Sequence, residues 1–146
     1  MSWQELYAKK RTTPTEAVRR IPCGQCVFIS SGAAEPIGLV QALVDQAGRF
    51  VDTHIVHLLT LGPAPYVEPK YEGNFRHNAF FIGGNVRSAV HAGRADYTPV
   101  FLSRIPSLIR SRRMPVDVAL IQCSPPDDFG YVNLGVSVDI GLAAIE

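Results

Sequence analysis

The sequence predicts an α/β fold in which helices flank an open, mostly parallel β-sheet. Three observations support this prediction. Short apolar runs typical of buried strands alternate along the 146 residues with segments of helical periodicity. The connections between them are short and rich in glycine and proline, as in βαβ units. The length, together with 47% hydrophobic residues, suits one domain with one core.

Two short helices are expected before the first strand. Residues 3–9 are compatible with the earlier one. The later helix is expected to start near Pro14 and to run toward Arg20, because Thr13 supplies a cap and Glu16 an acid in the first turn.

The first strand and its following helix are expected in direct succession. The apolar run 26–29 predicts a strand buried on both faces, and Ser30, Ser31 and Gly32 end it. Apolar residues then recur at helical spacing over 36–44, before a helix stop at Gly48.

The middle of the chain predicts two further strands with a long loop between them. The β-branched segment 53–60 indicates a second buried strand with Thr60 at its carboxyl end. Residues 62–76 contain three prolines and no periodicity, which predicts a loop. A strand over 79–82 and a helix over 86–93 are expected to follow.

The last third predicts a helix over 102–109, with Pro106 near its start, and a strand over 116–123. A final helix is expected to begin near Val138. The sequence ends at Glu146 inside that helix, so we expect a continuation beyond it.

Charge and composition argue against several classes of protein. The formal net charge of +1 and its even spread give no footprint for nucleic acid. No apolar run is long enough for a membrane span, and the polar start is no secretion signal, which favours the cytoplasm. Three cysteines form no disulfide framework, so we expect reduced thiols.

Ligands of an open parallel sheet bind at the carboxyl ends of its strands, where turns meet helix amino termini. The turn of Ser31 and Gly32 that leads to Pro36 permits close approach of a ligand backbone, although an ordinary tight turn is the alternative. The turn Gly83-Gly84-Asn85 is followed by Arg87, which could hold a carboxylate or phosphate or lie in solvent.

A third candidate turn comprises residues 124–131 after the last strand. It contains Ser124, Pro125 and Gly130, and two prolines stiffen it. Its paired aspartates have no histidine or third carboxylate nearby in sequence, so no metal site is predicted.

Two other patterns admit a chemical and a structural interpretation. Cys23 and Cys26 form a CxxC that precedes a strand, which favours ordinary thiols, one buried and one partly exposed, over a redox pair or half a zinc site. The arginines of segment 110–113 suit a solvated helix end, with binding of a CoA phosphate as the alternative. GxSxG, P-loop and GxGxxG motifs are missing.

Together these residues resemble the acetyl-CoA hydrolase/transferase family, and the resemblance extends over nearly the whole chain. The residues behind it are Ser31, Gly32 and Pro36, Leu59 and Thr60, the block Gly84-Asn85-Val86-Arg87 running on through 93–99, the segment 102–106, and Ser124-Pro125 through Gly130 and Tyr131 to 134–137.

The resemblance implies the amino-terminal CoA-transferase (NagB/RpiA-like) domain of such an enzyme, in part, over residues 1–146. In this family a glutamate attacks an acyl-CoA thioester and passes through an acyl-glutamyl anhydride to a glutamyl-CoA thioester. That glutamate belongs to a second domain, whose motif this sequence does not contain. Neither Glu35 nor Glu146 lies in its context, so no catalytic residue is predicted here and the chain alone is expected to be inactive.

The resemblance also implies the ligands and partners. Coenzyme A is expected as a substrate, with no covalently bound cofactor, and the other ligands are an acyl-CoA and a small carboxylate. A homo-oligomer, or a second domain or subunit, is expected to complete the cleft. The candidate substrate-binding residues are Ser31, Gly32, Thr60, Asn85, Arg87, Ser124, Pro125 and Gly130. The alternative is a noncatalytic α/β domain that binds a nucleotide or sugar phosphate.

Overall fold

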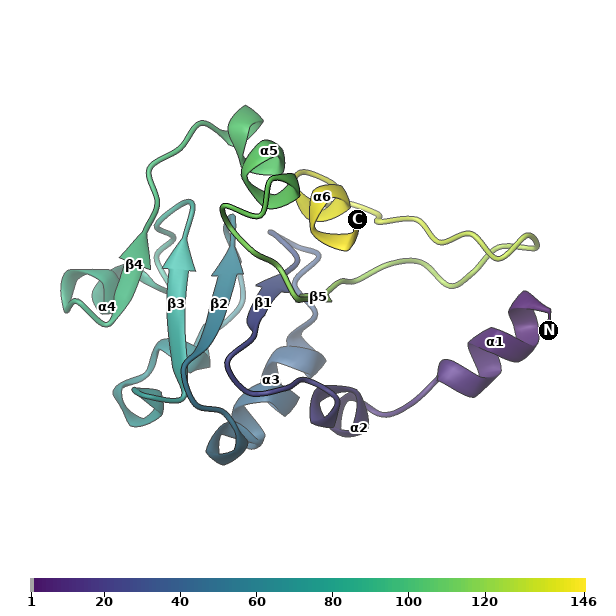
Figure 1. The fold of residues 1–146 in the computed structure, drawn as a ribbon, viewed down its shortest axis with the longest axis horizontal. Coiled ribbons are helices and arrows are strands. Elements are labelled where there is room, and N and C mark those ends of the chain that lie inside the picture. The colour runs from purple at the N-terminus through teal and green to yellow at the C-terminus, as the bar shows by residue number, and fades with distance from the viewer. Residues whose placement is uncertain (1) are drawn as a thin grey trace.

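The structure is a computed structural model and describes residues 2–146. It has an open five-stranded sheet in the order β4-β3-β2-β1-β5 (Figure 1). Every strand pairing is parallel, which confirms the predicted α/β class. The strands are β1 (Cys26–Ile29), β2 (Thr53–His57), β3 (Phe75–Ala79), β4 (Ala95–Tyr97) and β5 (Val118–Leu120), and the helices are α1 (Trp3–Lys10), α2 (Pro14–Arg19), α3 (Ile37–Asp45), α4 (Arg87–His91), α5 (Ile105–Arg110) and α6 (Gly141–Ile145).

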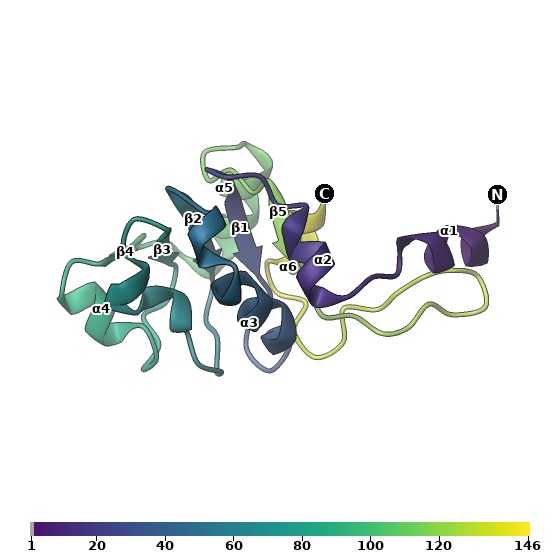
Figure 2. The ribbon, with the colours of Figure 1, turned by 90° about the horizontal axis from the view of Figure 1, so that it is seen from below.

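Helices cover both faces of the sheet, as Figure 2 shows from below. On one face, β-strand side chains such as Val27 and Ile55 pack with Val18 of α2 and Leu43 of α3. On the other, Phe28 and its neighbours pack with α5 and α6. β1 is therefore buried on both sides along its whole length, and this explains its uninterrupted apolar sequence.

The helices before the first strand begin where their caps predict. The Thr13 hydroxyl accepts a hydrogen bond from the Glu16 N–H at 3.2 Å, with Pro14 in the first turn of α2. α1 has a full capping box between Ser2 and Glu5. None of the helices among residues 2–146 is long and apolar enough to span a bilayer.

The prediction for the third strand was wrong. β3 is Phe75–Ala79, partly inside the segment expected to be a loop, whereas residues 80–82 lie beyond it. β4 was not predicted at all. Polar residues in both strands interrupt the apolar pattern from which strands are predicted. Arg76 of β3 and Asp96 of β4 form an ion pair at the edge of the sheet, with Nε and Oδ2 2.7 Å apart.

Several predicted elements are shorter in the structure. The segment expected as strand 53–60 is regular only to His57, and that expected over 116–123 only over Val118–Leu120. α6 begins at Gly141, not near Val138. The chain leaves regular pairing at the carboxyl ends of these strands, which is where the candidate site residues lie.

Candidate functional site

The turns after β1 and β2 lie against each other at the carboxyl edge of the sheet. Gly32 pairs with Thr60 in an isolated parallel bridge, and its N–H donates to the Leu59 carbonyl at 2.7 Å. Gly32 has a φ of 58°, in the left-handed region that glycine adopts without strain. Three predicted residues, Ser31, Gly32 and Thr60, are thus neighbours in space.

Asn85 joins the turn after β3 to this pair. Its side-chain Nδ2 donates to the Thr60 hydroxyl at 2.9 Å, to the Gly62 carbonyl at 2.9 Å and to the Thr60 carbonyl at 3.3 Å. A Cβ on Gly83 would lie 2.8 Å from the Asn85 Oδ1, so a glycine is needed there for close approach. Three strand-end turns therefore form one hydrogen-bonded unit.

The unit borders the point where the order of strands reverses. Chain order runs from β1 toward β4 in one direction, whereas β5 lies on the other side of β1. Connections that diverge in this way leave a crevice at the strand ends, which is the usual ligand site of open α/β sheets. The Ser31 hydroxyl donates to Asp139 Oδ1 at 3.2 Å, so the segment before α6 covers this crevice.

Glu35 is a further member of this unit that the sequence analysis did not assign to the site. Its side chain is 5% exposed, and its Oε2 accepts the Gly62 N–H at 2.7 Å. Burial raises the pKa of Glu35 above its ordinary value, against the opposing effect of that hydrogen bond. An acid placed between small residues and a helix-initiating proline was the one signal available in the sequence.

Two buried histidines and a tyrosine lie beneath the unit. The rings of His57 and His77 are stacked with centroids 4.2 Å apart, and Tyr66 packs near both. His77 Nδ1 is hydrogen-bonded to the Ile55 carbonyl at 2.9 Å. Burial lowers the pKa of His77 to about 4, and burial together with His77 holds the pKa of His57 well below its ordinary value. Both imidazoles are therefore neutral near pH 7.

The predicted basic contacts are not part of the unit. Arg87 is exposed in the first turn of α4, and its side chain forms no hydrogen bond or ion pair within residues 2–146. In the cluster at 110–113, Arg110 pairs with Glu146 at 2.6 Å and Arg112 approaches Asp117 at 3.6 Å. These contacts are those of a solvated helix end.

Ser124, Pro125 and Gly130 lie away from the strand-end unit. They belong to an arm formed by residues 121–139, which extends beside α1 at the end of the molecule distant from β4 and then returns to the unit at Asp139 (Figure 1). A cavity of about 490 Å³ between the arm and α1 is lined by all three residues. Gly130 packs on Trp3, since a Cβ there would lie 2.8 Å from the Trp3 Cγ.

Asp127, the first of the paired aspartates of the arm, has a structural role. Asp127 Oδ1 accepts the N–H groups of Phe129 and Tyr131, each at 2.9 Å, and so closes its own turn. Among residues 2–146 no group of three or more histidine, cysteine or acidic side chains is arranged to hold a metal ion.

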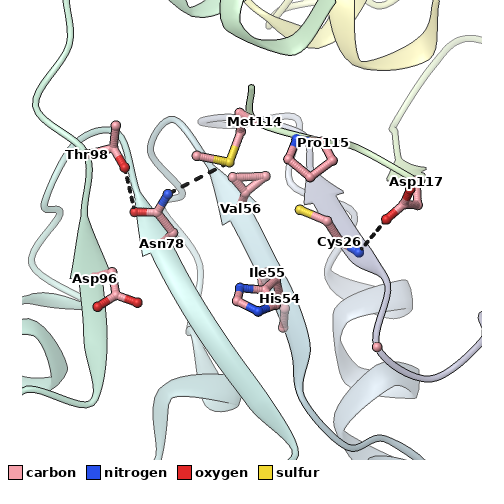
Figure 3. Close-up of a pocket in the computed structure, with 11 residues that line it drawn as sticks. Cys26, His54, Ile55, Val56, Asn78, Asp96, Thr98, Met114, Pro115 and Asp117 are labelled. Carbon is pink, nitrogen blue, oxygen red and sulfur yellow. Dashed lines mark hydrogen bonds between the residues drawn. The ribbon is translucent and has the colours of Figure 1, made fainter. Parts of the chain in front are cut away.

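A second cavity, of about 420 Å³, lies over the face of the sheet opposite α3, and Cys26, His54, Asn78, Asp96 and Met114 contribute to its lining (Figure 3). Its walls are mainly apolar. The polar contacts drawn there are the Asn78 amide near Met114 and Thr98, and the Cys26 N–H donating to Asp117 at 2.9 Å.

The CxxC is not arranged as a redox pair. Cys26 is buried, and burial, with Asp117 adding to it, raises the pKa of its thiol to about 11. Cys23 is exposed, and its Sγ contacts the backbone of Val51 instead. A reactive thiol needs a lowered pKa, so the burial and raised pKa of Cys26 do not suit a redox pair. The structure has one buried and one exposed thiol, close to the expected one buried and one partly exposed.

Comparisons with known proteins agree with this architecture. The family model for the acetyl-CoA hydrolase/transferase N-terminal domain matches residues 1–146. A 4-hydroxybutyrate coenzyme A transferase from Clostridium kluyveri is 44% identical over 146 residues, which are 100% of this chain and 34% of that protein. A succinyl-CoA:acetate/propanoyl-CoA:succinate CoA transferase from Fasciola hepatica is 45% identical over 125 residues, covering 84% of this chain and 26% of that protein.

Solved structures resemble the chain as well. RipA from Yersinia pestis superposes with a TM-score of 0.84 at 28% identity, over 93% of this chain and 34% of that one. A 4-hydroxybutyrate CoA-transferase from Porphyromonas gingivalis gives a TM-score of 0.77 at 28% identity, over 98% of this chain and 32% of that one. The chain spans about a third of the length of these relatives. It therefore belongs to the acetyl-CoA hydrolase/transferase family and corresponds to its N-terminal domain.

Proposed function

We propose that the chain is the amino-terminal part of an enzyme that transfers CoA from a short-chain acyl-CoA to a carboxylate, or hydrolyses the acyl-CoA with water. The observation that carries the proposal is the family match over residues 1–146, which includes all three strand-end turns. The alternative of a noncatalytic nucleotide-binding domain is not favoured, because the relatives that match the chain are named as CoA-transferases.

The proposed chemistry divides between this chain and residues outside it. A glutamate of a second domain would attack the thioester carbonyl and release the CoA thiolate, leaving an acyl-glutamyl anhydride. The thiolate would then attack the glutamyl carbonyl, giving glutamyl-CoA and the free acid, and an acceptor carboxylate or water would continue from there. Coenzyme A is a substrate in this scheme, and no covalently bound cofactor is needed.

The role proposed for this chain is to shape the site that receives the acyl group or the acceptor. Gly32 and Thr60 lie at the reversal of the strand order, the usual ligand site of an open α/β sheet, and Gly32 has no side chain to keep a carboxylate or thioester oxygen from the backbone. Ser31 and Asn85 would hold the turns in place. Ser31 and Thr60 are buried here, so a ligand would first meet the half-buried Gly32.

We also propose that the arm contacts a second domain or subunit, which would bring Ser124, Pro125 and Gly130 to the border of the cleft. Apolar side chains on the arm support this, because Phe129 is 79% exposed and Val136 is 77% exposed. Exposed apolar patches of this kind commonly mark interaction surfaces. Arg87 is a candidate contact for an acidic group of the substrate. The proposed location of the protein is the cytoplasm.

Acyl-CoA turnover by the purified chain, with acetate or succinate as acceptor, tests the proposal alongside calorimetric binding of CoA. We expect binding without turnover from the chain alone and turnover once the second domain is present. Turnover by the 146 residues themselves would contradict the assignment of the nucleophile to residues outside them. Failure of the two-domain protein to turn over any short-chain acyl-CoA would contradict the proposed activity.

A further inference from the structure

Glu35 is a carboxyl group in a place where residues 2–146 offer a negative charge one hydrogen-bond donor and no cation. Its Oε1 is buried and has no hydrogen-bond partner within residues 2–146, while its Oε2 has only the Gly62 N–H. None of the ion pairs in that part of the chain includes Glu35. An ionised carboxylate with a single donor is costly to bury, whereas a neutral acid costs much less.

The groups around Glu35 favour the neutral acid. Asn85 Oδ1 is also buried without a donor, and both side chains contact Gly62, one at its N–H and the other at its carbonyl. Two acceptor oxygens cannot satisfy each other, whereas a protonated Glu35 has an O–H that can donate a hydrogen bond to an acceptor of the unit. The Tyr66 hydroxyl, which is buried and close to both Thr60 and Glu35, is a second group able to accept a hydrogen bond from that O–H.

Few other charges face this group. The turns that pack beside it, residues 60–63 and 83–86, contain no ionisable side chain. Tyr66 is the titratable group presented by the 3-10 helix Pro65–Val67, and burial raises its pKa, so it is neutral as well. α3 begins two residues later and has its acid, Asp45, at the far end. Asp139 approaches the same turn through Ser31.

We propose that Glu35 positions the turn after β2 as a neutral carboxylic acid, and that its lack of charge allows the adjoining Gly32 and Thr60 to receive an anionic carboxylate acceptor. This inference rests on the proposed function. If Glu35 ionised, a negative charge would stand beside the acceptor and weaken its binding. The KM for the carboxylate would then rise, whereas kcat, which depends on the nucleophile elsewhere, would change little.

The protonation state can be measured without activity. The amide chemical shift of Gly62 in the 146-residue chain, followed by NMR between pH 4 and 9, reports ionisation of the acid to which it donates. We expect a midpoint above neutral pH, well beyond the value of about 4.3 for an ordinary glutamate, and no step in Glu35→Gln. A midpoint below neutral pH would overturn the inference, because Glu35 would then be a carboxylate at the pH of the assay.

The consequence for binding is measured in the active protein. Glutamine can accept the Gly62 N–H and donate an amide N–H where the acid donates its O–H, so Glu35→Gln should keep kcat and acceptor KM close to wild type. Glu35→Ala removes both contacts and should raise KM at every pH. As pH rises through the ionisation of Glu35, the wild-type KM should increase on the order of tenfold, while that of Glu35→Gln stays flat.

Controls separate the possible failures. Glu68→Gln changes an exposed glutamate that pairs with Lys70 and should leave the pH profile of KM as in wild type. If Glu35→Gln is as impaired as Glu35→Ala, the inference is wrong, since a charge and not a neutral acid is needed. If the wild-type protein turns over no acyl-CoA, the proposed function fails, and the Gly62 titration still decides the state of Glu35.

Discussion

Replacement of Asn85 by alanine tests whether its side chain holds the strand-end turns together. Asn85 supplies two N–H hydrogens to three acceptors, two of them at 2.9 Å. Losing two hydrogen bonds costs about 1 kcal/mol each, and leaving the buried Thr60 unsatisfied adds to this cost. The substitution also removes the unpartnered Asn85 Oδ1, which offsets part of the loss. We therefore expect Asn85→Ala to lower the free energy of unfolding by about 2 kcal/mol.

Thermal and urea unfolding followed by far-ultraviolet circular dichroism measures this change. For a domain of this size, about 2 kcal/mol corresponds to a fall in Tm of roughly 4 to 8 °C. Ser88→Ala, at an exposed position of α4, the helix that follows the turn of Asn85, is the matched control and should change stability by less than about 0.5 kcal/mol. An Asn85→Ala midpoint within about 1 °C of this control, at an unchanged urea m-value, would refute the reasoning.

Three further outcomes follow from the same geometry. Gly62→Ala places a Cβ 2.6 Å from Glu35 Oε2 and should cost about 1 to 3 kcal/mol of stability. In the control Gly48→Ala the new Cβ meets nothing within 4 Å and should cost little. Equal urea midpoints for the two variants would contradict the close approach at Gly62. His57 and His77 bind fewer protons in the folded than in the unfolded state, so the free energy of unfolding should fall as pH drops below about 6.5. The fall should be up to about 1.4 kcal/mol per pH unit for each histidine. For His77 it should level off near the pKa of about 4 in the folded state. Urea titrations between pH 7 and 5 that show no such slope would contradict the burial of both rings. In thiol labelling with Ellman's reagent, the two exposed cysteines should react at once and Cys26 after unfolding, and three equally fast thiols would contradict its burial.

The sequence by itself determined those elements whose residues all serve one packing role. Residues 26–29 were predicted as a strand and are β1 to the residue, because a strand buried on both faces has to be apolar throughout. The start of α2 followed from Thr13 and Pro14, since caps act within a single turn of chain. The turn of Ser31 and Gly32 was also located correctly, because it too is determined by neighbouring residues in the chain.

Polar strands could not be read from the sequence. His77 and Arg76 interrupt the apolar pattern of β3, and each is tolerated there because of a residue remote in sequence. The Ile55 carbonyl bonds the buried ring of His77, and Asp96 pairs with Arg76 across the sheet. A pattern of hydrophobicity contains no information about such partners, so β3 was shifted and β4 was missed.

Tertiary structure alone decided which turns meet. The bond between Ser31 and Asp139 spans 108 residues, and it forms because the chain crosses from β4 to the far side of β1 before entering β5. The same order of strands brings Asn85 and Glu35 to Gly62 and leaves Ser124 on the distant arm. Local sequence determines where a strand ends and turns, whereas the meeting of those turns depends on the order of the strands, which results from the packing of the whole sheet between its helices.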